Sequence, residues 1–240
     1  MRKGTISLLA ILFPLALVAF PQWTDTPKKD IVYSFLVFVA PGETTFHKDK
    51  CKHLTGGKTA IALIDAEQRG CKPCPECFPE AFPPSFIWTF SLEAPTRSSD
   101  LRYSDGLIDI AFVISKTQIG FIIQNKSSAG AKINWDELSF ISPINRASRV
   151  IHSGIRLVDR NNPQAPTTIP PGSSVTDNVL PSENLTYADG WEEGRLFDGD
   201  YMAYGGRSFG LYFPIEISGK KKEYSFKFKI AVTQVANSNK

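Results

Sequence analysis

The chain has 240 residues, of which 42% are hydrophobic and 21% are charged. These fractions are typical of a globular protein and exclude a disordered or fibrous chain. The formal net charge of +3 gives no strong electrostatic case for binding nucleic acid or an acidic membrane, so partners must be argued from local features.

The N-terminal segment, residues 1–22, predicts an export signal. Arg2 and Lys3 precede an apolar run from Ile6 to Phe20, which would span roughly 22 Å as a helix. A bilayer core is roughly 30 Å thick, so a cleaved signal peptide is favoured. A retained membrane anchor is the alternative, because Leu17 stands where a cleavage site usually has a small residue. We expect an exported protein (periplasmic, envelope-associated or secreted) that meets a membrane only through this segment, if it is not cleaved.

A small α+β module is expected in residues 30–80. The run from Ile31 to Ala40 predicts one buried strand, because it is dense in β-branched and aromatic residues. Further along, Thr59 to Leu63 predicts a short strand and Ile64 to Arg69 a short helix. A proline-rich segment, residues 78–84, then breaks regular structure and marks a domain boundary.

All four cysteines and two of the three histidines lie between Phe46 and Pro79. A C-x2-C turn supplies two thiolates from one loop, and a second pair of soft ligands from elsewhere completes a tetrahedral zinc shell. The two ends of the stretch carry such pairs, and a metal ion would close the loop between them. The pairs are His47 with Cys51, and Cys74 with Cys77.

Other interpretations of these residues remain open. The four cysteines could form two disulfides, for which three connectivities exist, although bridges within such short loops are strained. Cys71 is expected to be a small buried hydrophobe; its alternatives are replacing His47 as a ligand or joining an iron–sulfur run that ends at Cys77. His53 is expected to be a solvated loop residue, and it is the side chain available as a further metal ligand.

The stretch resembles a known zinc module over residues 44–79. It is similar to the module at the N-terminus of Ada-type DNA-repair methyl acceptors, and more similar to its relatives appended to bacterial exported proteins and nucleases. The resemblance implies a Zn²⁺ ion held by the four ligand positions. The matching positions are Phe46-His47-Lys48-Asp49-Lys50-Cys51, Ala66, Gly70 and Pro73-Cys74-x2-Cys77-x-Pro79.

One departure from the family pattern bears on activity. The methyl-accepting cysteine of the repair proteins corresponds to His47, and an imidazole is not the thiolate nucleophile that methyl capture requires. We therefore expect no repair activity. The module is also roughly neutral, so nucleic-acid binding is unsupported.

The part from Ser85 onward predicts strands separated by turns. Two strands alternate cleanly, Phe209 to Ile217 and Tyr224 to Val232, and residues 218–222 would join them as a hairpin. About seven strands favour an immunoglobulin-like antiparallel β-sandwich over residues 85–235. The polar stretch from Asp159 to Gly206 predicts only loop and short edge strands. The other predicted strands are Phe86–Leu92, Leu107–Ser115, Gly120–Gln124, Ala131–Trp135 and Arg149–Val158.

This C-terminal part also resembles uncharacterised exported bacterial β-sandwich proteins, a resemblance that implies no activity. It rests on Gln124-Asn125-Lys126-Ser127, Ile133-Asn134-Trp135-Asp136, the run from Val150 to Gly154 and the closing hairpin. Trp135 is expected in the core.

Outside the cysteine stretch, the sequence shows no convincing set of catalytic residues. The only histidine there, His152, lies in a β-rich segment and is expected to be a hydrogen-bonded structural residue. Asn125 and Asn184 begin glycosylation tripeptides, which are frequent by chance.

The sequence favours a non-enzymatic exported or envelope-associated binding protein, with a structural zinc site and a β-sandwich that binds an unknown protein or envelope partner. One alternative is a zinc-dependent hydrolase in which His53 or water completes an open shell. The other is a surface DNA-binding module, without methyl-acceptor activity, that uses Lys48, Lys50 and Lys52.

Overall fold

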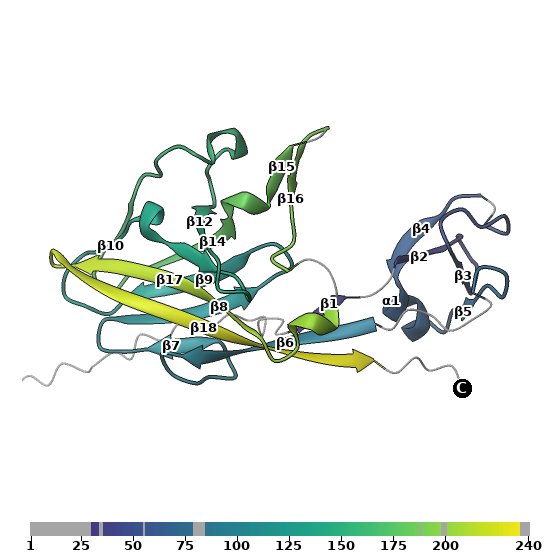
Figure 1. Cartoon of the computed structure of the whole chain (residues 1–240), viewed down its shortest axis with the longest axis horizontal. Coiled ribbons are helices and arrows are strands. Elements are labelled where there is room, and N and C mark those ends of the chain that lie inside the picture. Colours follow the sequence, from purple (N-terminus) through teal and green to yellow (C-terminus); the bar gives the residue numbers. More distant parts are fainter. Residues whose placement is uncertain are drawn as a thin grey trace, which may run out of the picture.

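The computed structural model describes residues 30–33, 36–54, 56–78, 85–187, 189–197 and 201–235. The expected export segment, residues 1–22, lies outside the described residues. The described chain is mainly β and antiparallel, with a large sheet and a small sheet that lie apart in Figure 1. None of the described helices has the length and apolar character needed to cross a membrane.

The small sheet has four strands in the order β4-β2-β3-β5. One short helix, α1, follows β4 and buries Leu63 and Ala66 against the sheet. The predicted short strand and helix at this point are thus confirmed to within a residue or so. The elements are β2 (Leu36–Val39), β3 (Thr45–His47), β4 (Thr59–Ala62), α1 (Leu63–Gln68) and β5 (Lys72–Pro73).

The large sheet has twelve strands, and most of them follow the path β1-β6-β18-β17-β11-β12-β14-β9-β8-β7. β10 pairs with β13 and β17 beside this path. The strands are β1 (Asp30–Tyr33), β6 (Ser85–Ala94), β7 (Arg102–Ser104), β8 (Ile108–Ile114), β9 (Ile119–Asn125), β10 (Ala131–Ile133), β11 (Ser139–Ile141), β12 (Ala147–His152), β13 (Thr167–Ile169), β14 (Ser174–Pro181), β17 (Ser208–Ile217) and β18 (Lys220–Val235).

A separate hairpin and four short 3₁₀ helices complete the described elements. The hairpin pairs Tyr187 with Trp191 at its tip and projects from the large sheet in Figure 1. These elements are β15 (Leu185–Tyr187), β16 (Trp191–Glu193), η1 (Trp135–Glu137), η2 (Leu157–Asp159), η3 (Ser182–Asn184) and η4 (Tyr201–Tyr204).

The large sheet is nearly closed on itself. The segment that precedes β7 exchanges two hydrogen bonds between Leu92 and Ser98, at 2.8 and 3.0 Å. A few residues later, the Leu101 carbonyl accepts a hydrogen bond of 2.9 Å from the Phe112 backbone of β8. This segment therefore links β6 to β8. The expected antiparallel sandwich is thus confirmed at the level of a sandwich-like or barrel-like β structure.

The closing hairpin is confirmed and is tighter than the sequence suggests. β17 and β18 pair from Ser208 with Lys229 to Ile217 with Lys220, so the turn is only Ser218-Gly219. Both turn residues have positive φ, 52° and 71°, as a type I′ turn requires. The predicted inward faces are buried except Val232, which is partly buried against the core. The buried members are Phe209, Leu211, Phe213, Ile215, Ile217, Tyr224, Phe226, Phe228 and Ile230.

The prediction of a single strand from Ile31 to Ala40 is wrong. Its first part forms β1 and pairs with β6 of the large sheet, where Tyr33 lies opposite Phe86. Its second part forms β2 and pairs with β3 and β4 of the small sheet. Residues 34–35 lie outside the described part of the chain. An apolar run indicates burial but not which sheet buries it, so the pattern could not reveal the division.

The prediction of only loop and short edge strands between Asp159 and Gly206 is also wrong. β14 is an eight-residue interior strand, paired with β12 on one side and β9 on the other. The sequence of β14 is polar in part because Ser174, Thr176 and Asn178 face solvent. Its fourth polar residue, Asp177, is buried, and hydrogen bonds from His152 and Ser153 satisfy its carboxylate.

Two predicted strands end early, each giving way to a 3₁₀ helix. Trp135 lies on η1 beyond the end of β10, yet it is fully buried as expected, and its indole nitrogen donates to the Thr167 hydroxyl at 3.0 Å. β12 stops at His152, and η2 follows at Leu157. Asn125 is fully buried, so its glycosylation tripeptide is a chance match.

Candidate metal centre

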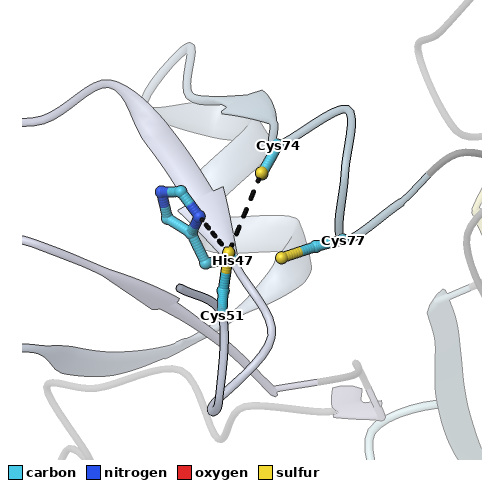
Figure 2. A group of neighbouring side chains, drawn as sticks. All are labelled: His47, Cys51, Cys74 and Cys77. Carbon is cyan, nitrogen blue, oxygen red and sulfur yellow. Dashed lines mark hydrogen bonds between the residues drawn. The ribbon is translucent and has the colours of Figure 1, made fainter. Parts of the chain in front are cut away.

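The side chains of His47, Cys51, Cys74 and Cys77 meet because two parallel strands end side by side. β3 and β5 pair with Phe46 opposite Pro73, so His47 and Cys74 are the next residues on adjacent strands. The Cys74 amide donates to the Phe46 carbonyl at 2.9 Å and fixes this register. Each strand then turns, and the turns deliver Cys51 and Cys77 to the same point (Figure 2).

The four donor atoms are close enough to share one metal ion. All lie within 4.8 Å of one another. The Nδ1 atom of His47 lies 3.3 Å from the sulfur of Cys51, which lies 4.0 Å from the sulfur of Cys74. Two sulfurs bound to one tetrahedral zinc ion at about 2.3 Å each would be about 3.8 Å apart. The separation of the Cys51 and Cys74 sulfurs is therefore close to that of two ligands of one ion.

The cluster is largely shielded from solvent, which makes several thiolates costly without a cation. His47 and Cys74 are each 3% exposed and Cys77 is 9% exposed. Burial raises the pKa of the Cys77 thiol to about 11. Burial also opposes ionisation of Cys74, but backbone hydrogen bonds from Cys77 and Glu76 outweigh it and lower the pKa of that thiol. A bound cation would supply the charge that the remaining thiolates need.

Cys71 lies outside the cluster, and all four cysteines are free thiols. It is half-buried and packs against the core of the small module, as expected of a small hydrophobe. The structure thus favours neither the two disulfides nor an iron–sulfur run through Cys71. Among the described residues, that core has four buried members, Val37, Phe46, Leu63 and Ala66.

His53 is exposed and contacts the carboxylate of Glu76 instead of the cluster. Lys52 approaches the same carboxylate, at 2.6 Å. The expectation that His53 is a solvated loop residue therefore holds, with the addition of this acidic partner.

An open cleft of about 500 Å³ borders the cluster on its histidine side. Glu43, four residues before His47, was not singled out by the sequence, because an exposed glutamate in a turn carries no signal of its own. Its Oε2 atom lies 3.5 Å from the Nε2 atom of His47. The cleft is lined by Glu43, Thr45, His47, His53, Cys74, Pro75 and Glu76.

His152 lies in the large sheet and has the structural role expected of it. Its Nδ1 atom lies 3.0 Å from Asp177, and its ring stacks on Trp135 with 4.2 Å between the ring centroids. The adjacent Ser153 bonds to the same carboxylate and not to the imidazole. In this arrangement both Ser153 and His152 bond to Asp177, which holds the two side chains apart from each other's hydrogen-bonding atoms.

Comparison with protein-family models, with curated proteins and with solved structures gives no match. The centre is therefore interpreted from its own geometry.

Proposed function

We propose that the protein is a non-enzymatic, exported or envelope-associated binding protein. Residues 36–78 form a structural zinc module, and the large sheet is an interaction domain for a protein or envelope partner. The observation that carries the proposal is the convergence of four soft donors within 4.8 Å. We propose in addition that the zinc module is of the Ada type and that the large sheet is an immunoglobulin-like sandwich. The proposal also includes export of the chain by its N-terminal segment.

Zinc is the metal that the donor set favours. Three thiolates and an imidazole form a soft tetrahedral shell of the kind zinc adopts in structural sites, whereas hard cations prefer oxygen ligands. The small apolar core of the module supports a structural role, because so few buried residues cannot supply its folding energy.

The enzyme alternative has weaker support. A catalytic zinc ion keeps an open position for water or substrate, and four protein ligands leave none. The DNA-binding alternative is also weaker, since the charges of two of its three lysines are engaged locally. Lys48 lies 5.3 Å from the centre of the Phe78 ring, and Lys52 pairs with Glu76.

The test is metal content and thiol titration of purified protein. Wild-type protein and Cys71→Ser should each contain one zinc ion per chain, whereas Cys74→Ser and His47→Ala should lose it. Cys71→Ser is the matched control because it removes a thiol from the same module without touching the cluster. Native protein with neither metal nor titratable thiols after unfolding would contradict the proposal, as would loss of zinc in Cys71→Ser with retention in His47→Ala.

A further inference from the structure

We propose that an open cleft over β6 and β18 of the large sheet binds a phosphate ester, and that Arg97 and Lys229 are the cations that hold its phosphate group. The cleft has a volume of about 380 Å³. That volume lies within the range of sites for small organic ligands. The cleft belongs to the large sheet, so this inference does not depend on the zinc centre and goes beyond the function proposed above.

The floor of the cleft is the solvent-facing side of two paired strands, β6 and β18 (Figure 1). Phe90 and Leu92 of β6 are buried in the core, so Ser91 between them points outward. Lys229 of β18 lies directly opposite Ser91 and points to the same side. The Cβ atoms of such cross-strand partners lie about 5 Å apart, so a hydroxyl and an ammonium group share one patch of the sheet.

The wall of the cleft is the segment that follows β6, and hydrogen bonds hold it in place. The Ser98 backbone exchanges two hydrogen bonds with Leu92, at 2.8 and 3.0 Å, which folds the segment back over the strand. The Ser98 hydroxyl oxygen accepts two more, from the backbone of Asp100 at 3.2 Å and of Arg102 at 3.3 Å. A hydroxyl has two lone pairs and one proton, so the proton remains available to an anion. Arg97 lines the cleft from the same wall.

The charges that line the cleft favour an anion. Of the described residues that line it, Glu93 alone carries a carboxylate, and Lys227 pairs with that carboxylate at 3.1 Å. Ser208 donates to it at 3.0 Å. The pKa of Glu93 is lowered, first by the hydrogen bond from Lys227 and last by the more distant charge of Lys229. Neither Arg97 nor Lys229 forms an ion pair within the described part of the chain, so two cations line the cleft without a direct ionic partner.

A phosphate monoester fits this set of donors. It has three acceptor oxygens and a charge of about −1.5 to −2 at pH 7, which two cations and the hydroxyls of Ser91 and Ser98 can match. A carboxylate carries one charge and would leave one cation unmatched. The guanidinium of Arg97 can bind two phosphate oxygens at once, whereas the ammonium of Lys229 acts as a point charge. The same group occurs in soluble esters and in the headgroup of phosphatidic acid, and the experiment separates these two sources.

The experiment measures binding of two probes to the full chain. Isothermal titration with glycerol 3-phosphate tests for a soluble ester. Cosedimentation with phosphatidylcholine vesicles, with and without phosphatidic acid, tests for a headgroup. We expect saturable binding of at least one probe, weakened by added NaCl. Arg97→Gln and Lys229→Gln should each weaken that binding by about tenfold, because each removes one charged hydrogen-bond donor.

Two further variants separate this site from general surface charge and from loss of folding. Arg102→Gln removes an exposed arginine of the neighbouring β7 that does not line the cleft, so its affinity should equal that of wild type. Glu93→Gln removes the lining carboxylate and frees Lys227, so it should bind the probe more tightly. An unfolded variant could not give that gain.

Three results would overturn the site. The first is no saturable binding of either probe by the wild-type protein. The second is wild-type affinity in Arg97→Gln, and the third is equal weakening in Arg97→Gln and Arg102→Gln, which would indicate a diffuse surface charge. None of these results changes the metal content of the protein, so the phosphate site and the zinc site fail independently.

Discussion

At the scale of single residues, the carboxylate of Asp105, in the turn between β7 and β8, joins the start of β8 to β18 of the large sheet. Asp105 accepts hydrogen bonds from the backbone of Leu107 and Ile108, from Lys222 and from the hydroxyl of Tyr224. Burial alone would raise the pKa of Asp105, but these donors outweigh it and hold the pKa well below its usual range. The ionised form is therefore the one that stabilises the fold.

We expect Asp105→Asn to lower the free energy of unfolding by about 2 kcal/mol at pH 7. Because the folded pKa is depressed, this stabilisation is complete above the unfolded pKa of about 3.9 and is lost as pH falls below it. Urea denaturation at pH 7 and pH 3 should show a difference between wild type and variant that shrinks at the lower pH. Glu216→Gln, which removes an exposed charge from β17, is the control. A pH-independent difference for Asp105→Asn would contradict this role.

At the scale of elements, the β17–β18 hairpin sets the register of the longest strand pair. Its turn needs positive φ at Gly219, 71°, where a side chain is strained even though nothing lies within 4 Å of the added Cβ. Gly219→Ala should therefore cost about 1 kcal/mol of unfolding free energy by urea denaturation. Gly106→Ala, which meets neither a neighbour nor a positive φ, should stay near wild type. Equal effects of the two substitutions would show that backbone conformation at the turn is not what matters.

At the scale of the whole molecule, the two sheets should differ in their dependence on metal. The small module buries four core residues, whereas the large sheet has an extensive core that includes Trp88 and Trp135. A chelator should melt residues 36–78 and leave the large sheet folded.

The tryptophans make this measurable, because none lies between residues 36 and 78. After zinc removal, amide protection should disappear from that segment in hydrogen exchange, while tryptophan emission stays unchanged. Re-addition of zinc is the control and should restore protection. A shift of tryptophan emission on chelation would mean that the large sheet also depends on the metal.

Sequence alone determined the features that are local. Ligand spacing identified the four residues that the structure brings together, because a C-x2-C turn and a His-x3-Cys segment each place two donors within one loop. Alternation identified the inward faces of β17 and β18, because side chains of a strand point to opposite faces with a period of two. Both signals are contained in a few consecutive residues.

The tertiary structure decided what depends on distant partners. The run from Ile31 to Ala40 divides between two sheets, because pairing with β6 or with β3 and β4 is a choice made across the fold. β14 is interior although its sequence is polar, because His152 and Ser153 on the neighbouring segment satisfy Asp177. Glu43 gained its position beside His47 only when the turn folded. Hydrogen-bond satisfaction and strand pairing are long-range properties, so no local pattern could have supplied them.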